Sequence, residues 1–130
     1  MRAANVKRIT PLVAGLALLA APAFAHHGTG QYDFTKEIPL TGRVKLYEFG
    51  SPHIWLTLEV PRPGGGVQAW SLEGPPPNYA IPRGWAADSL KTGQQVQVGM
   101  SPLRDGSNGG IIITVRDAAG KVLLERGRRY

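Results

Sequence analysis

Residues 53–60, His-Ile-Trp-Leu-Thr-Leu-Glu-Val, place Ile, Leu, Leu and Val at every second position. Successive side chains of an extended chain point to opposite faces, so this period of two predicts a strand with one buried face. The next six residues, Pro-Arg-Pro-Gly-Gly-Gly, can continue neither a helix nor a strand ladder and therefore predict a turn. A second strand-like run follows at 67–74, so the two runs together predict a β-hairpin.

The remaining segments extend this pattern to an all-β protein. Strand-like runs occupy 38–49, where Gly42 breaks the alternation as a bulge or tight bend would, and 94–103, where Val96, Val98 and Met100 share one face. Residues 111–125 contain two further runs about an Ala-Ala-Gly turn. The prolines of 75–93 allow only short helical turns, around 78–81 and 86–90.

This order predicts a small OB-like Greek-key barrel of five or six strands, with a short helical or irregular insert between strands 3 and 4. A small β-sandwich could accommodate the same strands.

The first 25 residues are typical of a cleaved secretory signal peptide. Basic residues at positions 2, 7 and 8 precede an apolar stretch at 12–21, which is too short to span a bilayer. Ala23-Phe24-Ala25 then supplies the small residues that a signal peptidase requires. We therefore expect export to the periplasm and a single mature domain over 26–130, with no membrane insertion after cleavage.

The composition of the mature chain limits its chemistry. The chain contains no cysteine, which excludes a disulfide framework and any thiolate metal site. Three of the 15 basic residues lie in the signal segment and none of the nine acidic residues does, so the mature chain carries a small positive excess. That modest charge, together with export, predicts no nucleic-acid partner. No nucleophile–base pair or cofactor fingerprint is evident, so the sequence predicts no catalytic residues and no enzyme, although metal-dependent redox chemistry stays open.

Several stretches together resemble one known family. They are "HHGTGQYD", "SPHIWLTLEVP", "WSLEGPPPNYAIPRGW", "DSLKTGQQVQVGMSPLRDG" and the nearby "NGG". They are distributed along the chain, so the resemblance extends over nearly the whole mature part. The set resembles a family of small exported bacterial proteins, the domain of unknown function six-one-five-two. Ser51 stands where the family's motif has Asn. The resemblance supports export and a single domain, and it implies no activity.

The three histidines of the chain, His26, His27 and His53, are the candidate metal ligands. Cleavage after Ala25 would free the α-amine of His26, which could then chelate one metal ion together with its own ring Nδ1. A further imidazole from His53 would complete a planar three-nitrogen set of the kind that suits Cu(II). His27 is the rival for that third position. His53 follows the first expected strand, in a connection that commonly lies on the ligand-binding face of an OB barrel.

Other residues near these histidines could support or replace the metal site. Tyr32 and Asp33 are close enough in sequence to offer oxygen ligands, or hydrogen bonds that orient the metal ligands. Glu48 and Trp55 flank the connection that contains His53. Trp55, Trp70 and Trp85 could instead form an aromatic face for a small ligand or a protein partner without any metal, although Trp55 and Trp70 would also suit a cross-strand packing pair. The histidine pair could equally be a polar chain start with no ligand, and His53 could cap a strand.

Overall fold

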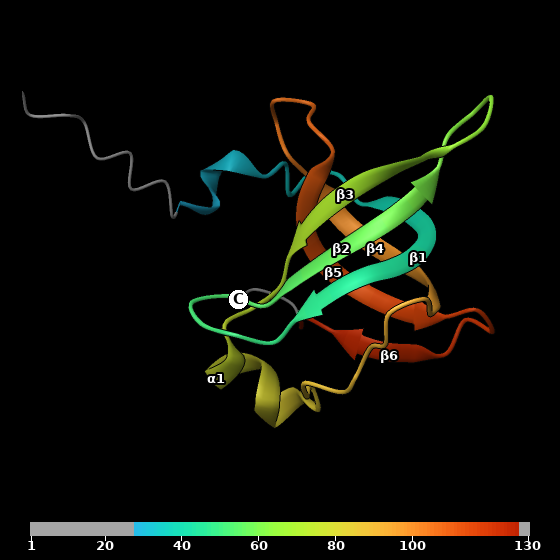
Figure 1. Ribbon diagram of the computed structural model, residues 1–130. Coiled ribbons are helices and arrows are strands. Elements are labelled where there is room, and N and C mark those ends of the chain that lie inside the picture. The colour runs from blue at the N-terminus through green and yellow to red at the C-terminus, as the bar shows by residue number, and fades with distance from the viewer. Residues whose placement is uncertain (1–27, 128–130) are drawn as a thin grey trace, which may run out of the picture.

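The computed structural model describes residues 28–127. These residues form six strands, two 3-10 turns and one short helix (Figure 1). Their bounds are η1 (Thr29–Gln31), β1 (Ile38–Glu48), β2 (Trp55–Pro61), β3 (Val67–Glu73), α1 (Pro77–Ala80), η2 (Ile81–Arg83), β4 (Gln95–Pro102), β5 (Gly109–Asp117) and β6 (Val122–Glu125). Within this part of the chain, no helix is long and apolar enough to cross a membrane. The expected signal peptide lies outside the described residues.

The strands close into a barrel. They follow the order β3-β2-β1-β4-β5-β6, and β3 also pairs with β5, so the first five strands form a closed ring to which β6 is added. All the adjacent pairs are antiparallel except the closing pair, in which Ser71–Glu73 run parallel to Gly109–Ile111. The expected OB-like barrel with a helical insert between strands 3 and 4 is therefore confirmed. The second expected helical turn, at 86–90, is wrong: a single turn bonds the Ser89 N–H to the Ala86 carbonyl instead (3.1 Å).

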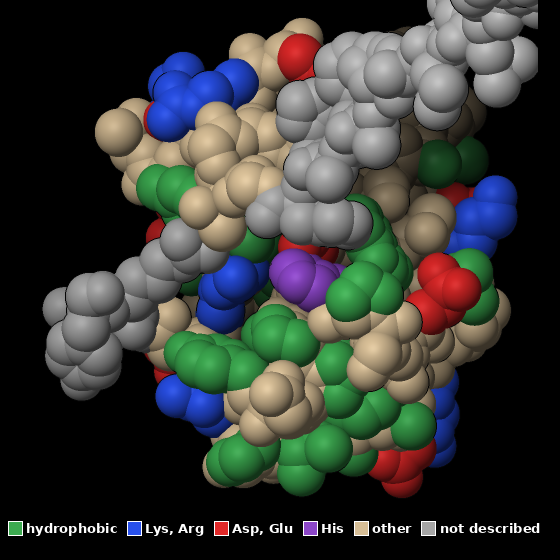
Figure 2. All heavy atoms as spheres, turned by 90° about the vertical axis from the view of Figure 1, so that its left-hand side faces the viewer, with side chains coloured by type: hydrophobic (Ala, Val, Ile, Leu, Met, Phe, Trp, Pro, Cys, Tyr) green, Lys and Arg blue, Asp and Glu red, His purple; other side chains and the backbone are tan. Residues whose placement is uncertain are grey.

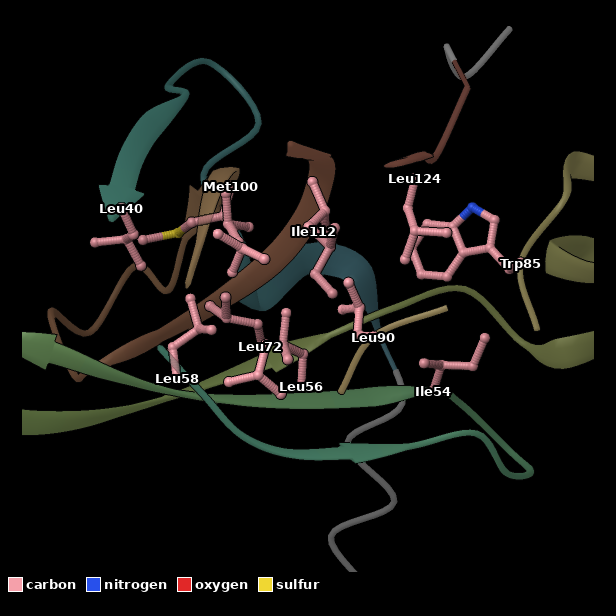
Figure 3. Packing of buried hydrophobic residues seen from close by; sticks show 14 of the residues in the cluster. Leu40, Ile54, Leu56, Leu58, Leu72, Trp85, Leu90, Met100, Ile112 and Leu124 are labelled. Atoms are coloured by element: carbon pink, nitrogen blue, oxygen red, sulfur yellow. The ribbon is translucent and has the colours of Figure 1, made fainter. Parts of the chain in front are cut away.

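The barrel interior is apolar. Ile54, which precedes β2, and Leu56 and Leu58 within β2 point into the barrel, as the period of two requires. Val96, Val98 and Met100 of β4 belong to the same buried cluster. Figure 3 shows Leu40 and Met100 toward one end of this core and Trp85 with Leu124 toward the other. The insert contributes Trp85, whose indole N–H donates to the Glu125 carbonyl (3.3 Å), so the short helical segment closes that end of the barrel.

Gly42 lies where β1 exchanges one neighbour for another. Residues 38–43 of β1 pair with β4, whereas residues 43–48 pair with β2. A Cβ atom at Gly42 would lie 2.6 Å from the Glu59 carbonyl oxygen, so only glycine allows the two backbones to approach this closely. The register shift itself falls later, between Val44 and Leu46, and it leaves Leu46 exposed. The expected break of the alternation is therefore not at Gly42: the ladder with β4 runs through it in register, and the bulge follows Val44.

We expect Gly42→Ala to lower the free energy of unfolding by about 1–3 kcal/mol, because the new methyl group has no space beside the Glu59 carbonyl. Gly50→Ala is the matched control, since no atom lies within 4 Å of a Cβ at that position, and we expect a change within about 0.5 kcal/mol. Urea denaturation of both variants measures the difference. Equal stabilities would contradict the close approach.

Candidate functional site

The N-terminal arm, residues 28–37, lies against the outside of the barrel (Figure 1). Backbone bonds attach it to the end of β4: the Asp33 N–H donates to the Pro102 carbonyl (2.8 Å), and the Arg104 N–H donates to the Gln31 carbonyl (2.9 Å). The Arg104 side chain adds a bond from Nε to the Gly30 carbonyl (3.1 Å). The arm therefore begins beside the seam at which β3 and β5 close the barrel.

Tyr32 gives the arm its buried contact. Tyr32 and Ile111 are both buried, at 3% and 1% exposure, yet neither belongs to the cluster that fills the barrel interior. Ile111 is the parallel partner of Glu73 across the closing seam. The arm thus forms a second, smaller buried layer on the outer surface, and Glu73 lies within it.

The carboxylate of Glu73 joins two distant parts of the chain. Its Oε2 accepts a hydrogen bond from the Tyr32 hydroxyl, and its Oε1 is paired with Nδ1 of His53. Tyr32 comes from the arm, Glu73 ends β3, and His53 lies in the connection between β1 and β2. We call these three residues the Glu73 cluster.

This arrangement favours one histidine nitrogen for ligand binding. A carboxylate only accepts hydrogen bonds, so we assign the proton of a neutral His53 to Nδ1, the nitrogen that faces Glu73. In the neutral imidazole the lone pair then lies on Nε2. The His53 side chain is 31% exposed whereas that of Glu73 is 12% exposed. Figure 2 shows the histidine at the surface, bordered by hydrophobic side chains. The geometry therefore presents one oriented imidazole to solvent.

The Tyr32 hydroxyl donates its proton to Glu73. Burial, followed by the hydrogen bond and the negative charge of Glu73, raises the pKa of Tyr32 far above its ordinary value of 10.0. A hydrogen bond from the Gln31 side chain, followed by the positive charge of Arg126, acts in the opposite direction. The phenol therefore keeps its proton at neutral pH and can donate it to Glu73.

The structure brings His53 and Tyr32 together, but it gives Asp33 and Glu48 other surroundings. Asp33 accepts bonds from the Thr35 N–H (3.2 Å) and hydroxyl (2.6 Å) and pairs with Lys36 (3.0 Å), so its carboxylate stabilises a turn of the arm. Glu48 is exposed on β1. It pairs with Trp55 of β2, which in turn pairs with Glu73 of β3, so a whole strand lies between Glu48 and Glu73. Two strand spacings put their backbones about 10 Å apart.

The three tryptophans do not form a common aromatic face. Trp55 lies on the outer face beside Glu73, whereas Trp70 pairs with Leu58 and packs against the core. Trp85 is buried at 2% exposure. Trp55 and Trp70 therefore point to opposite faces, and the expected cross-strand pair is wrong. The prediction of a shared platform fails because the hairpin register separates the two residues by three positions.

The surface also contains a groove, one wall of which is Phe34 of the N-terminal arm. It encloses about 740 Å³ above Gly99 of β4 and is lined by charged side chains and by Phe34. Phe34 packs edge-on against the Tyr32 ring, with ring centroids 6.1 Å apart. None of the three tryptophans lines this groove.

Metal ligation by the described residues alone is not supported. Within residues 28–127, no group of three or more His, Asp or Glu side chains gathers in a way that could hold a metal ion. His53 contributes one imidazole, paired with Glu73, and no second histidine lies within residues 28–127. The other two predicted ligands, His26 and His27, lie outside the described residues.

Glu73 is the site residue that the sequence analysis did not assign. The sequence of the predicted hairpin could have placed it. If residues are paired across the hairpin, starting from the turn at 62–66, Glu73 lies opposite Trp55. His53 lies two residues before Trp55 and therefore shares its face. The contact with Tyr32 carried no such signal, since it depends on where the arm crosses the barrel.

One of the comparisons with known proteins gives a match, and it names no activity. The family model described as "Family of unknown function (DUF6152)" matches residues 14–114. The chain belongs to this family, as its motifs indicated. No curated protein and no solved structure matches the chain significantly.

We expect Tyr32→Phe to lower the free energy of unfolding by about 1–3 kcal/mol, because it leaves one oxygen of a largely covered carboxylate without its donor. Tyr79→Phe is the control: the Arg83 guanidinium lies 3.5 Å from the Tyr79 ring centroid, and a phenyl ring keeps that stacking. Chemical denaturation compares the two. An equal cost for both variants would remove the special role of the Tyr32 hydroxyl.

We expect the stability difference between the wild type and Asp33→Asn to depend on pH. Hydrogen bonding by Thr35, followed by the contact with Lys36, lowers the pKa of Asp33 from 3.8 to about 2. A carboxyl whose pKa is lower in the folded state stabilises the fold above its ordinary pKa. That stabilisation should disappear as the pH falls from about 4 to 2. Denaturation curves across this range test it, and a constant difference would refute the assignment.

Proposed function

We propose that this protein is an exported copper-binding protein that carries or senses the metal in the periplasm. The proposed ligands are the α-amine and ring Nδ1 of His26, freed by cleavage after Ala25, and Nε2 of His53. His27 is a supporting ligand. A set of nitrogen ligands in one plane suits Cu(II), which also leads the divalent affinity order.

The observation that carries this proposal is the pairing of the Glu73 carboxylate with Nδ1 of His53. Metal-ligating histidines commonly donate their second ring N–H to a carboxylate, which fixes the ring orientation and makes the other nitrogen a better ligand. Glu73 has this relationship to His53, and the partial exposure of the imidazole leaves Nε2 accessible to an ion. Accessibility favours carriage or sensing over turnover.

Chain length supports the participation of His26. Tyr32 lies six positions after His26. An extended chain spans at most about 3.5 Å per residue, so about 20 Å is the upper limit of the distance between the α-amine and the Tyr32 backbone, and it is reached only if the η1 turn opens. The Tyr32 hydroxyl and Nδ1 of His53 contact the same carboxylate, so His53 lies inside that radius.

We expect the mature protein beginning at His26 to bind one Cu(II) ion with an EPR spectrum typical of nitrogen ligation. Acetylating the α-amine of His26 should abolish this spectrum, because it converts the chelating amine to an amide. His53→Ala should weaken binding at least about tenfold, whereas His27→Ala should have a smaller effect. Unchanged binding by the acetylated protein would show that the amine is not a ligand, and unchanged binding by His53→Ala would remove the barrel from the site.

A further inference from the structure

We propose that the N-terminal arm and the connection between β1 and β2 are energetically coupled through Glu73, so that each holds the other in place. The coupling goes beyond the proposed copper site, because it is a property of the metal-free protein. It rests on one carboxylate whose two oxygens are engaged by Tyr32 and by His53, residues 21 positions apart in the chain.

Glu73 is the fixed centre of this arrangement. Its backbone pairs with Trp55 of β2 on one side and with Ile111 of β5 on the other. Both partners of its side chain lie outside the barrel strands. The carboxylate is thus held by two ladders, while the segments that donate to it are attached more lightly.

The arm depends strongly on Tyr32. Among residues 28–37, only Tyr32 is buried, and the other side chains are exposed or half-buried. Detaching the arm would expose the Tyr32 ring and would also hydrate the Glu73 carboxylate. Water would then compete with His53 for that carboxylate.

The coupling is positive because the Tyr32 ring covers the Glu73 carboxylate. A hydrogen bond to a carboxylate is stronger where water is excluded, and the Tyr32 ring excludes water from Glu73. A docked arm therefore strengthens the contact between Glu73 and His53. Coupling free energies are reciprocal, so an intact His53 contact must favour the docked arm by the same factor.

If the proposed function is correct, this coupling regulates the copper site. A metal ion on Nε2 makes the Nδ1–H of His53 a stronger donor to Glu73, which favours the docked arm. The docked arm in turn holds the chain that leads to His26 near the barrel. Binding and docking would then reinforce one another.

The test is hydrogen exchange on the metal-free mature protein. The reporters for the arm are the amides of Asp33 and Arg104, and those for the connection are the amides of Ile54 and Gly74, which bond to the Pro75 and Ile54 carbonyls at 3.1 and 2.7 Å. We expect His53→Ala to speed exchange at the arm amides, and Tyr32→Phe to speed exchange at the connection amides, each at least about fivefold.

Matched variants separate coupling from general loosening. Glu73→Gln should speed exchange in both segments. Glu59→Gln removes the neighbouring outer-face carboxylate, which pairs with Lys45 at 3.7 Å, and should affect neither. His53→Gln keeps an N–H donor and should restore part of the protection of the arm. Circular dichroism checks that each variant is folded. If an alanine variant does not fold, the Glu73→Gln and His53→Gln variants provide the test instead.

The coupling is overturned if His53→Ala leaves the arm amides at the wild-type rate and Tyr32→Phe leaves the connection amides at that rate. It is also overturned if Glu59→Gln matches Glu73→Gln. Repeating the wild-type measurement with Cu(II) added separates the two proposals. Metal-free coupling in a protein that gives no nitrogen-ligated Cu(II) EPR spectrum would sink the copper function alone, whereas copper binding without metal-free coupling would sink this inference alone.

Discussion

The shared carboxylate of Glu73 is the interaction on which the candidate site depends. A carboxylate that is only 12% exposed must be compensated by donors, and here each oxygen has one. One donor is a buried phenol that keeps its proton because burial and the negative charge raise its pKa. The other is an imidazole, whose remaining nitrogen is left for solvent or a ligand. The position of the arm, the orientation of His53 and the burial of Tyr32 therefore all follow from this one group.

The barrel explains why such a site lies on the outside. Its interior is filled by apolar side chains from all five strands of the ring, with Trp85 at one end. A five-stranded barrel filled in this way has no space for a polar cluster. Polar chemistry must therefore use the outward-facing positions, which solvent would normally screen. The arm removes part of that screening by placing Tyr32 across the closing seam, so the fold obtains a protected polar site without opening its core.

The fold could be predicted from the sequence to a greater extent than the site. The period of two around Leu56 and Leu58 and the turn at 62–66 depend on local chemistry, so the hairpin and the inward-facing residues were recognisable. His53 and Tyr32 were recognisable as candidates because histidines are few and Tyr32 follows them closely. That both side chains contact Glu73 was not recognisable, because this contact depends on the path of an irregular arm. The error at Trp70 has another cause: the hairpin register, counted from the turn at 62–66, puts Trp70 opposite Leu58 on the inner face, and the pairing with Trp55 was expected from residue type alone.

The position of the histidine pair directly before the arm has a physical consequence. Residues 26 and 27 precede the segment that docks on the barrel, so any ligand chemistry at the chain start would be brought toward His53 only after residues 28–37 have found β4. Docking needs Pro102 and Leu103, and these positions exist only after β4 has paired with β5. The docked arm therefore presupposes a formed barrel. Under the proposed function, a chelate that also requires a free α-amine forms only on a chain that has been exported, cleaved and folded, and this order would protect the chain from binding metal before it has reached its destination.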